Sequence, residues 1–540
     1  MAVDKSGWVV GSVLAAQAAA RGDRPFLQFQ DEAPVTFAEA HQAADRLAGG
    51  LLRQGLQPGE HVGVMVPNGI PYCTIWFALS RLGVVQVCVN TAYRGSFLTH
   101  VLGNAGVRAL LIQADYLPLL AEIEADVPQL ERAFVLGLDA AAPPPRFRRI
   151  RLQPFEPLLE APGELPRLAV RPQDLGAIMY TSGTTGPSKG VLMPHAHLYL
   201  FGLGVVENLG LNTEDTYYIC MPLFHANAML MQLYGALIAG CKAVIAPGFS
   251  ASRWLDDIRR HGVTITNTLG VMTEFIYRQP ERPQDRDHRL RLVCAVPTPA
   301  DLREDFERRF NTRLIEGYGM TEVNIVAYHP LHQPYRSGSF GLPYRRYFDV
   351  RVVHPETDDE LPPGAVGELV VRPREAFGFV QGYHAMGEKT VEAWRNLWFH
   401  TGDAARRDED GYLYFVDRIK DCIRVRGEYL SSYEIEKVIA AHPAVAEVAA
   451  VAVHSDFAGG EDEVKVCIVL KDAARLTPQE VLDYCQPRMP YFAVPRFVEF
   501  VDALPKTPTA KVRKTVLREQ GTTAATWDRQ AAGYQLRRRA

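Results

Sequence analysis

The sequence predicts an α/β protein with a large N-terminal region and a small C-terminal domain. Between residues 60 and 250, short apolar runs alternate with helical patterns, as in "HVGVMVPNG" followed by "YCTIWFALSRLG". This alternation is typical of βαβ units, whose parallel strands are buried on both faces. The pattern returns in "KAVIAP", "VTITNTL" and "RLVCAVPT", before the charged helical stretch "DLREDFERRF". We therefore predict two βαβ-type subdomains in the N-terminal region.

After about residue 335 the pattern changes to short strands separated by turns. "DVRVVHP", "GELVVRP" and "GYLYFVDR" are divided by Pro/Gly and Asp-Gly turns, which favours antiparallel pairing and a β-barrel-like subdomain. From Arg418 onward, "SSYEIEKVIAAHP" and "TPQEVLDYCQPRM" indicate helices, and "AEVAAVAVH" and "EVKVCIVLK" indicate strands. The predicted domains are 1–417, a large N-terminal domain, and 418–540, a small α+β domain.

The composition excludes several classes of protein. Hydrophobic residues make up 47% and charged residues 22% of the chain, as in ordinary globular proteins. The net charge of −4 gives no basic field for nucleic acid. The apolar N-terminal stretch fits an amphipathic helix ending near Arg21 better than a signal peptide, and no run reaches the roughly 18 apolar residues of a membrane span. The eight cysteines are scattered, which predicts buried thiols in a reducing cytoplasm.

The stretch "YTSGTTGPSKG", Tyr180–Gly190, suggests a seat for phosphates. It follows the strand-like "GAIM" and combines glycines, hydroxyls and one lysine, which can surround an anion from several sides. It does not fit the pattern G-x-x-x-x-G-K-[ST], because counting from Gly183 places Ser188 at the second glycine, and Gly190 follows Lys189. A plain surface turn is the alternative interpretation.

Four further stretches carry polar residues in a fixed order along the chain. They are "EGYGMTE" (316–322), "WFHTGD" (398–403, with its carboxylate in a turn before a hairpin), "DRIKDCIRVRGEYLSSYEIE" (417–436) and "LPKTPTAKVRK" (504–514). With the Gly/Ser/Thr stretch they resemble the adenylate-forming superfamily of acyl-CoA synthetases, peptide-synthetase adenylation domains and luciferases. The resemblance extends from about residue 10 to 515. The segments "PKTPTAKVRK" and "TWDRQAAGY" are most similar to the crotonobetaine/carnitine-CoA ligase-like branch.

The resemblance implies an ATP-dependent acid–thiol ligase. In this family a carboxylate attacks the α-phosphate of ATP, which gives acyl-AMP and pyrophosphate, and coenzyme A then takes the acyl group. The β- and γ-phosphates leave together, so a hydroxyl-rich loop suits the reaction better than the cradle of a γ-phosphoryl transferase. The resemblance assigns the following residues to those phosphates: Thr181, Ser182, Gly183, Thr184, Thr185 and Lys189.

The resemblance also assigns residues to the nucleoside. Tyr318 would lie against the adenine, with the backbone of Glu316 and Gly317 beside the base. Asp403 would accept two hydrogen bonds from the ribose diol, for which a carboxylate is suited. Arg418 would assist at the ribose or the phosphate.

The catalytic assignments concern a second set of residues. Thr321 would bind the α-phosphate, and Glu322 would hold Mg²⁺, which prefers carboxylate and phosphate oxygens. Lys511 would stabilise the charge that develops during adenylation, although Ala510 stands where the family usually has glycine. His225 would line the passage between carboxylate and thiol. The structural alternatives are a solvated helix-start acid for Glu322 and a core histidine for His225.

The thioester step implies a mobile C-terminal domain. The resemblance places the pivot of its rotation at Lys420, two residues after Arg418. Gly427 in "RVRGEYL" would then pass close to the pantetheine of coenzyme A. The expected small-molecule partners are ATP, coenzyme A and a carboxylic acid, with no nucleic acid and no integral membrane contact, and a homodimer is left open.

Two other functions compete with the acid–CoA ligase. A free-standing adenylation domain would load an acid onto a carrier protein, but amino-acid activators place an aspartate shortly after the "PLFH" region. Here Ala226 and Asn227 follow His225, which argues against an amino acid. A non-catalytic nucleotide-binding regulator is the third hypothesis.

The acid pocket is expected near three segments, 220–233, 293–298 and 323–326. These segments are largely apolar, while Asn227 and Asn324 offer polar contacts. Such a wall predicts a medium-length or ring-bearing carboxylic acid and leaves fatty, aryl, steroid side-chain and carnitine-like acids open.

Overall fold

A computed structural model describes most of the chain as two compact units. The described residues are 5–138, 144–160, 162, 168–181, 187–298, 302–419, 423–425, 428–430, 432–454, 462–489, 493–506 and 511–536. One unit holds the chain up to Val350 together with Val371–Phe399, and the other holds Arg351–Val370 and the chain from His400 onward. The predicted division at residues 417 and 418 stays a prediction, and each unit is described by itself below.

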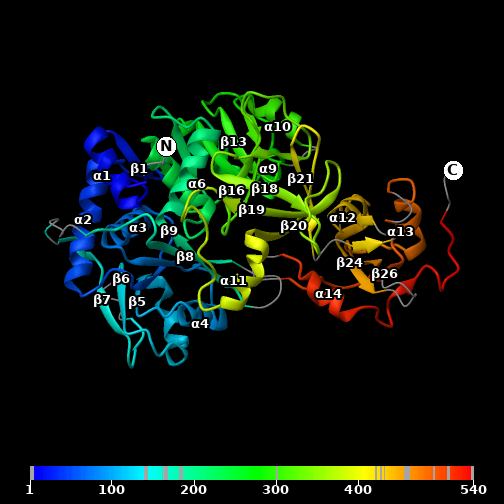
Figure 1. The fold of residues 1–540 in the computed structure, drawn as a ribbon, viewed down its shortest axis with the longest axis horizontal. Coiled ribbons are helices and arrows are strands. Elements are labelled where there is room, and N and C mark those ends of the chain that lie inside the picture. Colours follow the sequence, from blue (N-terminus) through cyan, green and yellow to red (C-terminus); the bar gives the residue numbers. More distant parts are fainter. Residues whose placement is uncertain are drawn as a thin grey trace. The chain divides into compact units, whose positions relative to one another are not determined.

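The first sheet of the N-terminal unit is mainly parallel. Its strand order is β7-β6-β5-β3-β4-β8-β9, and only β8 and β9 pair antiparallel. The strands are β3 (His61–Met65), β4 (Val85–Cys88), β5 (Ala109–Gln113), β6 (Arg132–Leu136), β7 (Arg151–Pro154), β8 (Leu175–Thr181) and β9 (Lys189–Pro194). A buried aliphatic cluster fills its core, and its elements are coloured blue to cyan in Figure 1.

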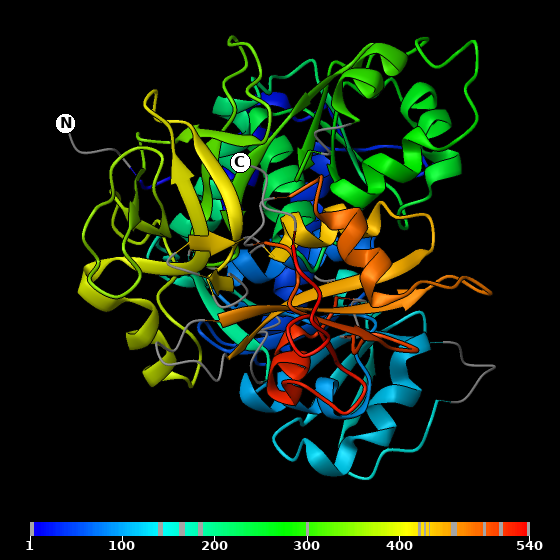
Figure 2. The same cartoon turned by 90° about the vertical axis from the view of Figure 1, so that its right-hand side faces the viewer.

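The second sheet has the order β14-β13-β12-β10-β11-β1-β2 and is parallel except for β2. The strands are β1 (Pro25–Phe29), β2 (Val35–Thr36), β10 (Thr216–Ile219), β11 (Lys242–Ile245), β12 (Ile265–Leu269), β13 (Leu292–Val296) and β14 (Arg313–Ile315). Figure 2 shows its green helices at the upper right, apart from the cyan elements at the lower right. Because these strands run in parallel, the carboxyl ends of β10, β12, β13 and β14 share one edge.

The helices of this unit confirm the predicted βαβ alternation. The longer ones are α1 (Val10–Arg21), α2 (Phe37–Arg53), α3 (Ile70–Leu82), α4 (Gly95–Asn104), α6 (His195–Asn208), α8 (Ala251–Arg260), α9 (Gly270–Tyr277) and α10 (Arg303–Phe310). The shorter ones are α5 (Leu117–Glu122), α7 (Gly235–Ala239), α11 (Gly387–Ala393) and the 3-10 turns η1 (Ala114–Tyr116), η2 (Glu124–Asp126), η3 (Glu156–Glu160) and η5 (Arg395–Leu397). A π-helix, η4 (Asn227–Tyr234), precedes α7. The predicted amphipathic first helix ending near Arg21 is thus confirmed.

Short strands follow the two α/β sheets, as predicted for the region after residue 335. In the N-terminal unit, β15 (Gly317–Met320) pairs antiparallel with β16 (Asn324–Tyr328), which pairs antiparallel with β17 (Ser339–Pro343). Four further strands pair in the order β21-β20-β19-β18. They are β18 (Phe348–Val353), β19 (Val366–Pro373), β20 (Phe399–Arg407) and β21 (Leu413–Arg418).

The C-terminal part of the second unit is a small α+β body, as predicted. Its sheet has the order β24-β25-β26-β27, with β24 (Val445–His454), β25 (Asp462–Leu470), β26 (Phe497–Phe500) and β27 (Trp527–Asp528). Its helices are α12 (Ser432–Ala440), α13 (Pro478–Cys485) and α14 (Lys514–Gln520), and β22 (Ile423–Val425) pairs with β23 (Glu428–Leu430). Thr477 and Glu480 form a reciprocal capping box that starts α13.

The cysteines behave as the sequence predicts. The seven within the described residues are buried and carry free thiols, and burial raises the pKa of the Cys88 thiol to about 11. A search of the described helices finds none with the length and apolar character of a membrane span.

Candidate active site

A hairpin frames the Gly/Ser/Thr stretch. Strands β8 and β9 pair so that Thr181 lies opposite Lys189. The remaining predicted phosphate ligands in this stretch lie outside the described residues; they are Ser182, Gly183, Thr184 and Thr185. The structure thus places the two ends of the predicted phosphate loop side by side.

A distant segment of the chain adds a tyrosine to this hairpin. The Leu192 amide donates to the Gly382 carbonyl at 3.0 Å, and the His384 amide donates to the Gly190 carbonyl at 2.8 Å. These bonds dock the segment against β9, so that the Lys189 ammonium lies 4.6 Å from the ring centroid of Tyr383. A cation over an aromatic face is held by electrostatic attraction. Tyr383 therefore helps to position Lys189.

Glu322 lies where these groups converge. Its carboxylate oxygen Oε1 accepts from the Tyr383 hydroxyl at 3.1 Å and from the Thr181 hydroxyl at 3.3 Å. The residue is 4% exposed and lies in the turn between β15 and β16, so the alternative of a solvated helix-start acid is wrong. Burial raises the pKa of the Glu322 carboxyl, while the two hydroxyls and the Lys189 charge lower it.

The environment of Glu322 fits a hard cation shared with a substrate. One buried carboxylate beside hydroxyl groups offers only oxygen ligands, and Mg²⁺ is commonly bound by one or two carboxylates plus substrate phosphates. Among the residues that the structure describes, no three His, Cys, Asp or Glu side chains gather into a metal-binding group. A magnesium ion held by Glu322 would therefore take its remaining ligands from phosphate oxygens and water.

His197 on α6 fixes the turn that carries Thr321 and Glu322. Burial lowers the pKa of the His197 imidazole to about 4, so the ring is neutral. Its Nδ1 lies 3.1 Å from the Asn324 side-chain amide nitrogen, and its Nε2 lies 2.9 Å from the Thr321 carbonyl oxygen. Because Asn324 donates to Nδ1, the proton is on Nε2 and is donated to Thr321.

Asn324 completes this network from an unusual backbone conformation. Its φ is +73°, in the left-handed region where asparagine is enriched. The same amide nitrogen donates to the Gly378 carbonyl at 3.1 Å, and the side chain is fully buried. The Asn324 amide nitrogen is therefore held by His197 and Gly378, and no local sequence pattern indicates this pairing. The expected contact of Asn324 with the acid substrate stays a prediction.

The predicted adenine contact lies at the carboxyl end of β14. Tyr318 is 9% exposed and stacks on Phe340, with ring centroids 4.7 Å apart and planes at 30°. The Glu316 carbonyl accepts from the His329 amide at 2.9 Å, which anchors the backbone before Gly317. The predicted base-binding residues are therefore on a rigid strand connection.

The Glu316 carboxyl is itself buried. It is 8% exposed and accepts from the Tyr335 hydroxyl at 3.3 Å. Burial raises the pKa of the Glu316 carboxyl to about 7, although the hydrogen bonds from Thr298 and Tyr335 lower it. This carboxyl therefore titrates near neutral pH.

Glu316→Gln is expected to increase thermal stability at pH 8 but not at pH 4.5. A carboxyl whose pKa is about 7 in the fold and 4.5 ordinarily contributes stability that is fully present below pH 4.5 and lost as pH rises through 7. This difference corresponds to about 3 kcal/mol. Melting temperatures of both proteins from pH 4.5 to 8 measure the effect. The exposed Glu281 provides the control variant Glu281→Gln, and a pH-independent difference for Glu316→Gln contradicts the prediction.

Asp403 and Arg418 form an ion pair across two strands of the second unit. They are register partners of β20 and β21, and the Arg418 Nε lies 2.8 Å from the Asp403 Oδ1. The predicted turn at Asp403 is wrong, because the residue lies inside β20. Gly402, with φ of +70°, bends the strand locally, which explains why "HTGD" resembles a turn in sequence. Pairing brings both predicted ribose ligands together.

Lys511 lies between two fixed points of the C-terminal body. The backbone of Lys506 bridges to Val512, and Lys511 itself is exposed. Three residues on, the Lys514 ammonium lies 2.8 Å from Glu436 and donates to the Ser432 hydroxyl at 2.6 Å. The predicted pivot Lys420, Gly427 and Ala510 lie outside the described residues.

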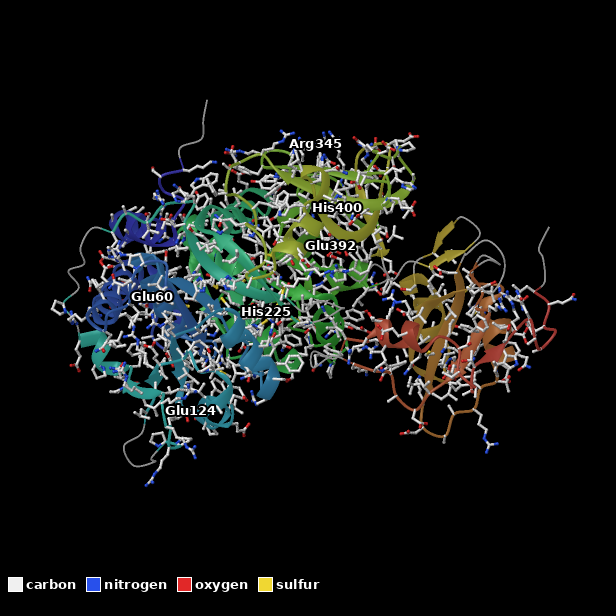
Figure 3. All side chains as sticks on the ribbon, turned by 60° about the horizontal axis from the view of Figure 1, so that its bottom comes forward. Glu60, Glu124, His225, Arg345, Glu392 and His400 are labelled. Carbon is white, nitrogen blue, oxygen red and sulfur yellow. The ribbon has the colours of Figure 1, made fainter. Side chains whose placement is uncertain are left out.

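His225 is not a core residue. It is exposed and lies just before η4, and its carbonyl accepts from the Met229 amide at 3.0 Å. Its ring packs against Phe224 with centroids 4.6 Å apart, and Figure 3 labels its position. The alternative of a core histidine is thus wrong, while the predicted passage role stays a prediction.

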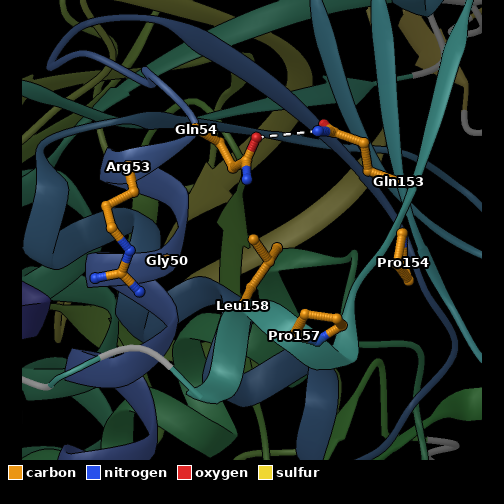
Figure 4. A pocket seen from close by; sticks show the side chains of 7 residues that line it. All are labelled: Gly50, Arg53, Gln54, Gln153, Pro154, Pro157 and Leu158. Carbon is orange, nitrogen blue, oxygen red and sulfur yellow. Dashed lines mark hydrogen bonds between the residues drawn. The ribbon is translucent and has the colours of Figure 1, made fainter.

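Two surface cavities lie apart from all these residues. One of about 230 Å³, between α2 and β7, contains the hydrogen bond from Gln153 to Gln54 at 3.0 Å (Figure 4). Another of about 160 Å³ lies beside α8 and includes the side chains of Asp257 and Arg260. Neither is lined by a predicted site residue, so neither locates the active site.

The chain belongs to the AMP-binding enzymes. Residues 14–384 match this family, and residues 434–511 match the AMP-binding enzyme C-terminal domain. The first match covers more than half of the chain and includes Thr181, Lys189 and Glu322. The predicted adenylate-forming superfamily is therefore confirmed.

Individual relatives are similar over nearly the whole chain. Crotonobetaine/carnitine–CoA ligase of Citrobacter koseri is 29% identical over 509 residues, which cover 92% of this chain and 96% of that protein. The anthranilate CoA ligase AuaEII, solved with anthranoyl-AMP, aligns with a TM-score of 0.81 at 26% identity and covers 95% and 97% of the two chains. ATP-bound MatB from Rhodopseudomonas palustris aligns with a TM-score of 0.80 at 26% identity and covers 95% and 99%. The predicted branch and the class of AMP-forming acid–CoA ligases are confirmed.

Proposed function

We propose that the enzyme activates a carboxylic acid with ATP as acyl-AMP and then transfers the acyl group to coenzyme A. The observation that carries this proposal is the convergence of Thr181, Lys189 and Tyr383 on one buried carboxylate, Glu322. A cation, hydroxyl donors and a carboxylate for a metal are what a departing pyrophosphate requires.

In the first step a carboxylate oxygen of the acid bonds to the α-phosphorus. The bond from phosphorus to the bridging oxygen breaks, and pyrophosphate leaves with the electron pair. Lys189 and Thr181, with Ser182, Gly183, Thr184 and Thr185, bind the β- and γ-phosphates, and Thr321 orients the α-phosphate. Magnesium held by Glu322 would supply positive charge against the phosphate oxygens.

Further residues position the nucleoside and the reacting groups. Tyr318 lies against the adenine beside the backbone of Glu316 and Gly317, and Asp403 with Arg418 binds the ribose. Lys511 stabilises the negative charge that develops between the acid and the α-phosphate.

In the second step the thiolate of coenzyme A bonds to the acyl carbon, AMP leaves with the electron pair, and the thiol proton passes to solvent. Residues 418–540 form a mobile domain that pivots at Lys420 and removes Lys511 from the acyl carbon. Gly427 lets the pantetheine pass close to the backbone, and His225 lines the passage. Pivots of this type change φ/ψ at only a few residues.

The expected products are AMP and pyrophosphate, not ADP and phosphate. The reason is that the Gly/Ser/Thr stretch departs from the γ-phosphoryl transfer pattern at Ser188 and Gly190. Chromatography of reactions with ATP, Mg²⁺, coenzyme A and a panel of carboxylic acids measures this. Stoichiometric ADP would refute the proposal, and ATP binding without turnover would favour the non-catalytic regulator.

Two further assays test the partners of this reaction. Thioester formation on a pantetheinylated carrier protein, and not on coenzyme A, would favour the carrier-loading alternative. The homodimer is a hypothesis that light scattering tests. A cytoplasmic location is inferred from the free, buried cysteines, and fractionation tests it.

A further inference from the structure

A series of hydrogen bonds between buried side chains links β10 and β12 of the second sheet and ends at Asn227. The Tyr217 hydroxyl donates to the Asn267 side-chain carbonyl at 2.6 Å, and the Asn267 amide nitrogen donates to the Asn227 side-chain carbonyl at 2.8 Å. The Gln232 amide nitrogen donates to the same Asn227 oxygen at 2.9 Å. Tyr217, Asn267 and Gln232 are fully buried.

The burial of these side chains decides which atom of each amide donates and which accepts. With the donors and acceptors given above, one buried acceptor of these residues has no partner, the Gln232 Oε1. Reversing the amides would instead leave both the Tyr217 O–H and the Gln232 N–H₂ without an acceptor among the described residues. Buried donors without partners are rarer than under-satisfied carbonyls. The two donors to its Oδ1 therefore fix the Asn227 amide.

The consequence is that the Asn227 amide nitrogen is a hydrogen-bond donor with a fixed orientation. With Oδ1 occupied by Gln232 and Asn267, the Asn227 amide nitrogen has no hydrogen-bond acceptor within the described part of the chain, and Asn227 is half-buried. The residues that follow Asn227 in η4 include the buried apolar side chains of Met229, Leu230 and Leu233. The segment 224–233 contains no aspartate or glutamate, so nothing in it pairs with a substrate cation.

The sheet order places this donor on the same edge as the nucleotide residues. Asn227 lies in η4, on the connection that leaves the carboxyl end of β10, and Tyr318 lies in β15, just after the carboxyl end of β14, while Asn267 lies inside β12. Three strand spacings separate β14 from β10, which is roughly 14 Å. Ligands of open α/β sheets bind outside this edge. A ligand with its adenine at Tyr318 can therefore extend its acyl end toward Asn227.

We propose that the acid substrate carries an oxygen acceptor on its acyl group, as in an oxo or hydroxy acid, and that Asn227 donates to this oxygen. The proposal rests on the proposed acid–CoA ligase function. An oriented donor favours an acyl oxygen over plain hydrocarbon, because a hydrocarbon would cover the Asn227 N–H groups without replacing their hydrogen bonds to water. The lack of an aspartate or glutamate in the segment 224–233 disfavours an ammonium-bearing acid.

Matched pairs of acids test the proposal on the full-length enzyme. The probes are pentanoate against 4-oxopentanoate, octanoate against 7-oxooctanoate, and benzoate against 4-hydroxybenzoate. We expect kcat/KM for AMP release to be at least about tenfold higher for the oxygenated member of one or more pairs, the size expected from one buried hydrogen bond. Asn227→Leu, of similar volume, is expected to bring that ratio close to one.

A second variant tests whether the orientation of the Asn227 amide, and not only the packing around it, determines the preference. Tyr217→Phe removes the hydroxyl that orients Asn267 and is expected to lower the ratio without removing it. Asn208→Leu, at a half-buried asparagine of α6 whose amide donates to Gly204, is the matched control and should keep the full ratio. Equal use of both members in every pair, or a preference that persists in Asn227→Leu, overturns the inference. AMP release with hydrocarbon acids in those cases would leave the ligase function intact, whereas ADP as product, or no AMP with any acid, would refute that function.

Discussion

Lys511→Ala is expected to lower the rate of acyl-AMP formation by about 10²–10³, the usual cost of removing one aimed donor. Thioester formation from supplied acyl-AMP and coenzyme A should stay near the wild-type rate, because the lysine is assigned only to the first step. The structure supports a positioned lysine, since the Lys506–Val512 bridge and the Lys514–Glu436 ion pair hold the chain on either side. Pyrophosphate release and thioester formation, measured separately, check the two steps.

A nearby lysine provides the control for this prediction. Lys506→Ala removes a partly exposed side chain whose ammonium lies 2.7 Å from Glu447. Exposed ion pairs contribute about 0–1 kcal/mol, so both half-reactions should change little. Equal losses of both half-reactions in Lys511→Ala would show that this lysine is structural.

Glu322→Gln is expected to reduce acyl-AMP formation by about 10²–10³ and to raise the Mg²⁺ concentration for half-maximal rate. The amide keeps the shape of the side chain and its contacts with Thr181 and Tyr383, but it removes the charge that a cation requires. Pyrophosphate release at a series of Mg²⁺ concentrations measures both effects. An unchanged rate with an unchanged Mg²⁺ dependence would mean that Glu322 has only a structural role.

The melting temperature of Glu322→Gln shows whether its loss of activity comes from misfolding. Because burial raises the pKa of Glu322, the ionised carboxylate is disfavoured in the fold above its ordinary pKa. The melting temperature of Glu322→Gln at pH 8 without ligands should therefore equal or exceed that of the wild type. Tyr383→Phe is the matched variant, since it removes one hydroxyl donor worth about 1 kcal/mol, and its rate should fall by about tenfold or less.

Local patterns predicted most helices and strands and the motif residues of the site. The alternation of strands and helices, the capping residues of α13 and the strand before Thr181 all depend on neighbours within a few positions. Such signals correctly placed β8 and α12. They failed at Asp403, because "TGD" carries turn residues while the cross-strand partner Arg418 keeps the residue in β20.

The supporting residues of the site could not be found in this way. His197 contacts Thr321 across 124 positions of sequence, and Tyr383 contacts Glu322 across 61. Neither residue belongs to a quoted motif. The partners of the Asn324 amide could not be found for the same reason, since they come from α6 and from Gly378.

The sequence by itself determined which chemical groups are present and in what order, from the hydroxyls and lysine of 181–189 to Glu322, Asp403 and Lys511. It also determined the alternation of elements, because side-chain periodicity is a local property. Only the tertiary structure decided that Glu322 is buried, that His197 is neutral and that the amide of Asn227 is oriented. The physical reason is that desolvation and hydrogen-bond partners come from residues distant along the chain, which only packing brings together.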